Sequence, residues 1–210
     1  MTGRGLVAVA RGRVVERPVP VPTRRDDELL LVTEASWISN GTELSFVRGE
    51  RHAGDTPWAP GHPDPFPHVA EAARDGSGPL VGSRVFATIS RVEGHAFEHA
   101  GHLELSAVAT SQVLDLPDGA NPLEYAPLVL TQVGRNAARR AHVGPGDRAI
   151  VIGDGLVGQW AARTLAADGI ETAVLGRRDN RLARLPAPIV RFRDPETAAE
   201  WFAGGAAIVQ

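Results

Sequence analysis

Residues 148–178 read RAIVIGDGLVGQWAARTLAADGIETAVLGRR, and the rest of the chain can be interpreted outward from this segment. The apolar run 149–152 predicts a buried strand, a helix-like segment follows at 156–167, and a second apolar run at 172–175 predicts the next strand. Between the first strand and the helix stand three glycines with the spacing G-x-G-x-x-G, namely Gly153, Gly155 and Gly158. A strand, a glycine loop, a helix and a strand in this order are typical of a dinucleotide-binding unit.

Each glycine of this loop has a separate expected role. Gly153 allows the tight turn out of the strand, Gly155 lets the backbone approach a pyrophosphate, and Gly158 lets the helix pack against the sheet. The first N–H groups of the helix, at Leu156 and Val157, together with the positive end of the helix dipole, are expected to hold the phosphates. The alternative is a glycine-rich turn that binds no ligand.

The end of the second strand indicates the type of cofactor. An NAD site usually has Asp or Glu there, to accept hydrogen bonds from the ribose hydroxyls. This chain has Gly176, Arg177 and Arg178 instead. Guanidinium groups suit a phosphate, and Gly176 leaves room for one, so the sequence predicts NADP(H). Two alternatives stay open: a small change of register would bring Asp179 to the site, and the arginines could be solvated loop charges.

Composition excludes several classes of protein. The chain has 210 residues, of which 43% are hydrophobic and 22% charged, which suits one large or two small globular domains. The net charge of −3 gives no broad basic surface, so we expect no nucleic-acid partner. Cysteine is absent, which excludes disulfides and thiolate zinc sites. No run approaches the roughly 20 apolar residues that span a bilayer, and the N-terminus lacks a signal peptide's apolar core, so we expect a cytoplasmic protein and no membrane.

The character of the chain changes near residue 121. Residues 1–121 contain short strands and turns, which favour a β-rich barrel, with a proline-rich loop expected at 48–68. Residues 122–210 begin with helical spacing and continue as β-α-β-α-β-α-β, which predicts a parallel sheet by the right-handed crossover rule. In its last part, Asp194 and Pro195 are expected to start a helix, as N-cap and first helical residue.

Four segments resemble the medium-chain dehydrogenase/reductase superfamily. They are SWISNGTE at 36–43, GSRVFATIS at 82–90, GHLELSAVATSQVLDLPDG at 101–119 and LTQVGRNAARRAHVGPGDRAIVIGDGLVG at 130–158. The resemblance implies an α/β fold, with an N-terminal GroES-like β-barrel domain (1–121) followed by a partial Rossmann parallel sheet (122–210). The SxxSxGTE form is similar to that of the zinc-free branch that includes bacteriochlorophyllide-type dehydrogenases.

The resemblance also implies candidate catalytic residues. Thr42 matches the family position whose hydroxyl relays a proton from the substrate alcohol, although an ordinary turn or N-cap threonine is an equal alternative. Ser39 and Asn40 belong to the same turn and could hydrogen-bond a carbonyl oxygen. Thr131 lies where the linking helix faces the cofactor in similar proteins.

Three departures from the family pattern change the expectations. Zinc-binding members have a cysteine where Ser39 stands, and the cysteine-rich zinc lobe is missing. The segment PFPHVAEAARDGSGPLVGSRVF predicts that one barrel strand is shortened or lost. The sheet is expected to end after its fourth strand, in the order 3-2-1-4, which leaves residues 206–210 as an open edge. Three alternatives stay open: a second copy or another chain covers this edge, the protein dimerises differently, or the chain is a fragment.

We do not expect the histidines to bind a metal. His95, His99 and His102 lie close together in the sequence, but without cysteines they predict a loop near the pocket mouth rather than a metal site. His62 and His68 are expected to be solvated, with a role as acid or base as the alternative.

Two functional hypotheses of different classes follow. The first is a zinc-independent, NADP(H)-dependent oxidoreductase that moves a hydride between the nicotinamide and a carbonyl, alcohol or activated alkene of a small metabolite. The second is a shortened homologue without redox activity, which binds a nucleotide or a partner, or which catalyses non-redox chemistry.

Overall fold

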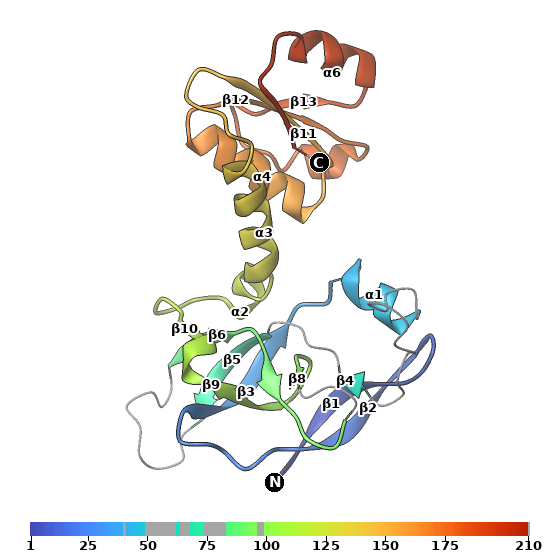
Figure 1. Cartoon of the computed structure of the whole chain (residues 1–210), viewed down its shortest axis with the longest axis vertical. Coiled ribbons are helices and arrows are strands. Elements are labelled where there is room, and N and C mark those ends of the chain that lie inside the picture. The colour runs from blue at the N-terminus through green and yellow to red at the C-terminus, as the bar shows by residue number, and fades with distance from the viewer. Residues whose placement is uncertain (40, 49–61, 64–67, 74–82, 96–98, 210) are drawn as a thin grey trace. The chain divides into compact units, whose positions relative to one another are not determined.

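The computed structural model of the chain describes residues 1–39, 41–48, 62–63, 68–73, 83–95 and 99–209. These residues form two compact units, Met1–Pro127 and Leu128–Gln210 (Figure 1). The first unit is built from antiparallel strands and the second from a parallel sheet with helices. Within the described residues, no helix is long and apolar enough to cross a membrane.

The first unit contains two sheets. A three-stranded sheet has the order β2-β1-β4, and a seven-stranded sheet has the order β10-β6-β5-β3-β9-β7-β8. Short runs of alternating buried and exposed residues form these strands, as the sequence predicts for half-buried sheets. The strands are β1 (Thr2–Ala10), β2 (Arg13–Pro20), β3 (Glu28–Ser36), β4 (His62–Pro63), β5 (His68–Ala73), β6 (Arg84–Ala87), β7 (Ser90–Arg91), β8 (His99–Ala100), β9 (Leu105–Ala109) and β10 (Val113–Asp115).

The barrel strand that was predicted to be shortened or lost is present in the structure. Strand β5 spans His68–Ala73 and pairs antiparallel with β3 on one side and with β6 on the other. Its sequence, HVAEAA, has a weak intrinsic preference for a strand, because alanine and glutamate are both depleted in sheets. Pairing along both edges forms the strand anyway, and this information lies in the neighbouring strands rather than in the segment itself.

The core of the first unit consists of aliphatic side chains on the facing strands. One cluster contains Leu31, Val85, Ala87 and Val108, and a second contains Val7, Val19, Val92, Ala100 and Leu103. A 3-10 turn (Thr110–Gln112), the helix α1 (Thr42–Val47) and the helix α2 (Pro122–Tyr125) complete the unit. Asn121 caps α2 by accepting a hydrogen bond from the N–H of Leu123, and this helix lies within the first unit, Met1–Pro127.

The second unit has the parallel strand order β13-β12-β11-β14, which confirms the predicted 3-2-1-4 order. Its helix α6 begins as the sequence predicts, since the Asp194 carboxylate accepts the N–H of Thr197 and Pro195 follows it. The elements are α3 (Leu128–Arg139), β11 (Arg148–Ile152), α4 (Leu156–Ala167), β12 (Glu171–Leu175), α5 (Asp179–Leu182), β13 (Val190–Phe192), α6 (Pro195–Phe202) and β14 (Ala207–Val209).

Helices cover both faces of this parallel sheet (Figure 1). Ala149 and Val151 of β11 pack on one face with residues of α3 and α4. Ile150, between them in sequence, packs on the other face with Ala198 of α6. Successive side chains of a strand point to opposite faces, and a parallel sheet buried on both sides reads as a continuous apolar run. This explains the run at 149–152 and directs the carboxyl end of β11 into the glycine loop.

Candidate cofactor site and polar cluster

The glycine loop between β11 and α4 has the turn geometry that its spacing predicts. Gly153 has a φ of 127°, in the left-handed region where a side chain would be strained. A Cβ on Gly158 would lie 2.1 Å from the carbonyl oxygen of Gly153, so α4 can pack against the loop only with glycine there. Gly153 and Gly158 are therefore required by the fold of the second unit itself.

The middle glycine differs from the other two. A Cβ on Gly155 would meet no atom within 4 Å, so the fold leaves open space beside it. Gly155 is also the N-cap of α4, where no side chain caps the helix and no acidic residue stands in the first turn. The following residues, Leu156 and Val157, are half-buried. An open backbone at an uncapped 12-residue helix is the arrangement that accepts an anion such as a pyrophosphate.

Asp154 ties this loop to the end of β12. Its buried carboxylate accepts hydrogen bonds from the backbone N–H groups of Arg177 (2.8 Å) and Arg178 (2.7 Å), and Arg181 Nη1 lies 3.6 Å from its other oxygen. Burial alone would raise the pKa of Asp154, but the two backbone hydrogen bonds and the neighbouring arginines outweigh it and lower the pKa. Asp154 is thus held as an anion that fixes the backbone of both arginines.

Gly176 makes room for this carboxylate. A Cβ on Gly176 would lie 2.7 Å from Asp154 Cβ and 2.8 Å from Leu182 Cδ2. Protein atoms therefore fill the space beside Gly176 that was predicted to hold a phosphate. The contact between Gly176 and a cofactor stays a prediction, and its packing role is an addition that the sequence did not reveal.

The side chains that follow Gly176 give the site an excess of positive charge. Arg177 and Arg178 are both exposed. Asp179, the acid that could compete with an NADP assignment, forms an ion pair with Arg193 Nη1 at 2.7 Å. With Arg181 next to Asp154, four arginines in this region oppose two aspartates. Thr131, the other predicted cofactor residue, stands in the first turn of α3, where its hydroxyl donates to the Leu128 carbonyl at 2.7 Å.

In the first unit, the predicted catalytic turn leads from β3 into α1. Ser39 is buried, its backbone N–H donates to the Glu43 carboxylate, and its carbonyl accepts the N–H of Glu43 at 3.0 Å. Thr42 begins α1, but its side chain lies outside the described residues, as does the whole of Asn40. The structure therefore places Ser39 and the backbone of Thr42 together at the start of one helix.

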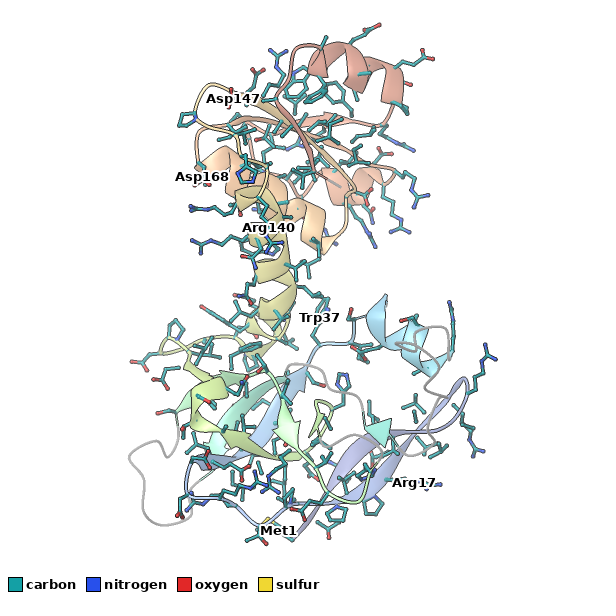
Figure 2. All side chains as sticks on the ribbon, viewed as in Figure 1. Met1, Arg17, Trp37, Arg140, Asp147 and Asp168 are labelled. Atoms are coloured by element: carbon teal, nitrogen blue, oxygen red, sulfur yellow. The ribbon has the colours of Figure 1, made fainter. Side chains whose placement is uncertain are left out.

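Three polar residues that the sequence analysis did not assign to the site form a hydrogen-bonded chain beside this turn. Ser36 Oγ lies 2.7 Å from His102 Nδ1, and His102 Nε2 lies 3.0 Å from Glu43 Oε2. His102 and Glu43 are buried, whereas Ser36 is exposed. Trp37 follows Ser36 where β3 leaves the sheet, and its side chain is labelled in Figure 2.

The prediction for the histidine group changes accordingly. His102 was expected in a loop near the pocket mouth, but its side chain is buried and lies within hydrogen-bond distance of the Glu43 carboxylate. In the part of the chain that the structure describes, no group of three or more histidine, cysteine, aspartate or glutamate residues could hold a metal ion. The side chains of His62, His68 and His99 lie outside that part.

Comparison with known proteins supports the architecture. No protein-family model matches the sequence. An oxidoreductase/dehydrogenase of unknown specificity from Escherichia coli superposes with a TM-score of 0.76 and 20% identity, over 97% of this chain and 67% of the other. The quinone oxidoreductase of Thermus thermophilus, which was also solved with NADPH, gives a TM-score of 0.72 and 24% identity, over 94% of this chain and 63% of the other. The chain has the medium-chain dehydrogenase/reductase fold.

Two further similar proteins bear on the identity of the cofactor and on how much of its relatives' length this chain spans. Acetophenone reductase from Geotrichum candidum NBRC 4597, solved with NAD, has this fold too, with a TM-score of 0.72 and 16% identity over 92% of this chain and 64% of the other. L-galactonate-5-dehydrogenase of Escherichia coli (strain K12) is 30% identical over 97 residues, which are 44% of this chain and 28% of that protein. The chain thus spans about two thirds of the length of the similar structures. Among these similar proteins, the quinone oxidoreductase was solved with NADPH and the acetophenone reductase with NAD, so both forms of the dinucleotide occur in proteins with this fold.

Proposed function

We propose that this protein is an NADP(H)-dependent oxidoreductase that works without zinc on a carbonyl, an alcohol or an activated alkene of a small metabolite. The observation that carries the proposal is the loop after β12, where Asp154 fixes the backbone of Arg177 and Arg178 and leaves both side chains exposed. A planar guanidinium binds a phosphate through two parallel hydrogen bonds, which is the recognition that a 2′-phosphate requires.

The residues of the second unit fit a dinucleotide. The open backbone at Gly155 and the uncapped start of α4 would receive the pyrophosphate, and the exposed arginines would receive the 2′-phosphate. The competing acid, Asp179, is paired with Arg193, which reduces its ability to accept a ribose hydroxyl. When bound, the nicotinamide ring would supply or accept a hydride.

Residue chemistry supports independence from zinc. The chain contains no cysteine, so the thiolate that zinc-binding members of this fold place at the catalytic turn is replaced by Ser39. A neutral serine hydroxyl is a far weaker zinc ligand than a thiolate, an imidazole or a carboxylate. The charge that develops on the substrate oxygen would then be stabilised by hydrogen-bond donors of the first unit, including the predicted Thr42.

The test is turnover of NADPH by the purified protein with two probes, acetophenone and 1,4-benzoquinone. The proposal predicts oxidation of NADPH that depends on the probe and is lost in the Gly155→Ala variant, whose added methyl group would occupy the open space at the loop. An unchanged Gly155→Ala rate would show that any turnover does not use this site. Absence of turnover with both probes would contradict the proposed function.

A further inference from the structure

Asp154 connects two parts of the candidate cofactor site. Its neighbours in the chain are Gly153 and Gly155, and the space beside Gly155 is open. Its carboxylate reaches the end of β12, where a single oxygen, Oδ2, accepts the backbone N–H groups of Arg177 at 2.8 Å and of Arg178 at 2.7 Å. One residue of the glycine loop therefore holds the backbone of both arginines.

The carboxylate of Asp154 acts as an anion that belongs to the protein. Successive backbone N–H groups that converge on one point form a site for an anion, and here the buried carboxylate fills that site. Hydrogen bonds to a charged acceptor are roughly twice as strong as those to a neutral one. The negative charge of Asp154 therefore orders the backbone of Arg177 and Arg178 before any ligand arrives.

The same contacts leave the guanidinium groups of Arg177 and Arg178 available. Both residues are exposed, and neither guanidinium group has a hydrogen bond or an ion pair with any residue that the structure describes. Arg181 differs from them, because its Nη1 lies 3.6 Å from Asp154 Oδ1. The loop after β12 thus combines a fixed backbone with two unengaged guanidinium groups.

We propose that Asp154 is a positioning residue for cofactor selection, and that its negative charge strengthens the binding of the 2′-phosphate by holding Arg177 and Arg178 in place. This inference rests on the proposed NADP(H)-dependent function and concerns residues of the second unit alone. Its sign is opposite to that of direct electrostatics. A carboxylate near a phosphate site repels the phosphate, so repulsion alone predicts stronger binding once the charge is removed.

Two observations favour preorganisation over repulsion. The charge of Asp154 is compensated where it stands, by two backbone N–H groups and by the nearby guanidinium group of Arg181. Both N–H groups also share one acceptor oxygen, so loss of the charge weakens the two hydrogen bonds together. A loop that must become ordered during binding has a lower affinity than one that is ordered beforehand.

The packing around Asp154 defines the substitution that tests its charge. A Cβ on Gly176 would lie 2.7 Å from Asp154 Cβ and 3.0 Å from Asp154 Oδ2, so glycine there is what admits the carboxylate. Gln159 Nε2 donates to the carbonyl oxygens of Asp154 and Arg181, each at 3.2 Å, and so joins the glycine loop to α5. Asparagine has the shape of aspartate, so Asp154→Asn removes the charge without requiring this packing to change.

The experiment is calorimetric titration of the full-length protein with adenosine 2′,5′-bisphosphate and with 5′-AMP, which differ only in the 2′-phosphate. We expect the wild-type protein to bind the bisphosphate at least about 10-fold more tightly. In Asp154→Asn the affinity for the bisphosphate should fall about 5-fold, while that for 5′-AMP should change less than about 2-fold.

Asp147→Asn is the matched control for this substitution. Asp147, labelled in Figure 2, also accepts a backbone N–H, that of Gly144 at 2.7 Å, but it does so in the turn before β11. The control removes the same charge from the same unit without touching the loop after β12. It should leave both affinities at their wild-type values.

The outcomes separate the proposal from the proposed function. Tighter binding of the bisphosphate by Asp154→Asn would overturn the proposal, because repulsion would then be the larger effect. Unchanged affinities, or equal losses for both probes, would also overturn it, because Asp154 would then have no role or only a general structural role. All three results leave the NADP(H) assignment intact if the wild-type protein prefers the bisphosphate. A wild-type protein without that preference would overturn both.

A second readout needs no variant. Amide hydrogen exchange followed by NMR reports whether the N–H groups of Arg177 and Arg178 are hydrogen-bonded in the protein without a ligand. The proposal predicts slow exchange at both positions and little further slowing when adenosine 2′,5′-bisphosphate binds. Fast exchange that becomes slow only with the bisphosphate would overturn the proposal, because the arginines would then be ordered by the ligand rather than by Asp154.

Discussion

At the residue scale, three glycines of one motif have different physical reasons to be glycine. Gly153 is required by its φ of 127° and Gly158 by the 2.1 Å approach of a carbonyl oxygen to its Cβ position. Gly155 has neither constraint, since its Cβ would meet open space. A motif that looks uniform in the sequence therefore combines two structural positions with one position that is free for a ligand.

This difference predicts opposite behaviour for two alanine variants. Gly155→Ala should fold with nearly wild-type thermal stability and lose affinity for NADPH, because the methyl group takes the space of the ligand. Gly158→Ala should lower the free energy of unfolding of the second unit by about 2 kcal/mol or more, because α4 must move away from the loop. Thermal denaturation and calorimetric titration of both variants check this. A Gly155→Ala protein that is destabilised as much as Gly158→Ala would contradict the assignment.

A buried ion pair in the first unit predicts a pH dependence of stability. Arg91 lies 2.8 Å from Glu28 Oε1, and the hydrogen bond from Arg91 together with the N–H of Arg25 lowers the pKa of Glu28 from its ordinary 4.5 to about 2. The folded state therefore resists protonation of Glu28, and the stability from this pair is present above about pH 4.5 and lost as the pH falls towards 2. The loss should reach about 3 kcal/mol.

Chemical denaturation of the wild-type protein and Glu28→Gln across this pH range measures the effect. The variant should be less stable near neutral pH, because Arg91 loses a buried partner, and the difference between the two proteins should shrink as the pH falls. Other carboxylates contribute to the total slope, so the difference is the quantity to follow. A constant difference at all pH values would show that Glu28 does not titrate in this way.

At this scale the sequence predicted the turn geometry of the glycine loop but not the hydrogen-bonded chain of Ser36, His102 and Glu43, for a physical reason. Residues 153–158 are contiguous, and their spacing carries the geometry of a turn and a helix start. His102 lies 66 residues from Ser36 and 59 from Glu43, so their contact exists only after the strands pair. The burial of His102 depends on the pairing of β3 with β9. The sequence does not show this pairing, so it gave no sign that His102 is buried.

At the scale of elements, the pairing of α3 with α4 depends on a close approach of their backbones. A Cβ on Gly134 of α3 would lie 2.5 Å from the Val157 carbonyl oxygen and 2.8 Å from Trp160 Cβ. Glycine within a helix is unfavourable by itself, by about 1 kcal/mol relative to alanine, so helix propensity alone favours alanine at this position. The packing requirement reverses that preference.

Gly134→Ala should therefore destabilise the second unit, by about 2 kcal/mol, despite the better helix former. The exposed residue Arg135→Ala, one position later, is the matched control, because it changes the same helix without approaching α4. Urea denaturation of both variants measures the change. Stabilisation by Gly134→Ala would show that the two helices are further apart than in this structure.

Strand β5 is an element that its own sequence does not predict. The parallel unit was predicted because each of its segments carries its own signal, including the cap of α6 by Asp194. The segment HVAEAA carries almost none and forms a strand because β3 and β6 pair with both of its edges. Weak strands in the middle of an antiparallel sheet are therefore the elements most easily missed in a sequence.

At the scale of the whole molecule, the two units have separate cores. The clusters around Leu31 and Val7 belong to residues 1–127, and the clusters around Val151 and Ile150 belong to residues 128–210. Mutations far apart that share no partners usually have additive effects on stability.

Additivity across the units is therefore expected for Glu28→Gln and Gly134→Ala. In the double variant, each substitution should lower the stability reported by its own unit by the same amount as in the single variants. Hydrogen exchange followed by mass spectrometry resolves the two units by their peptides. A change in protection of the second unit on Glu28→Gln alone would contradict separate cores.

The most direct test of the proposed cofactor specificity is calorimetric titration of the purified protein with NADPH and with NADH, repeated on the Arg177→Ala/Arg178→Ala variant. Our interpretation predicts that the wild-type protein binds NADPH at least about 10-fold more tightly than NADH, since a charge-assisted hydrogen bond contributes about 1.5 kcal/mol or more. The double variant should lose this preference and keep its affinity for NADH, whereas Arg17→Ala, which removes an exposed arginine of the first unit, should change neither value. Tighter binding of NADH, or a preference for NADPH that survives the double substitution, would contradict the assignment of Arg177 and Arg178 to the 2′-phosphate.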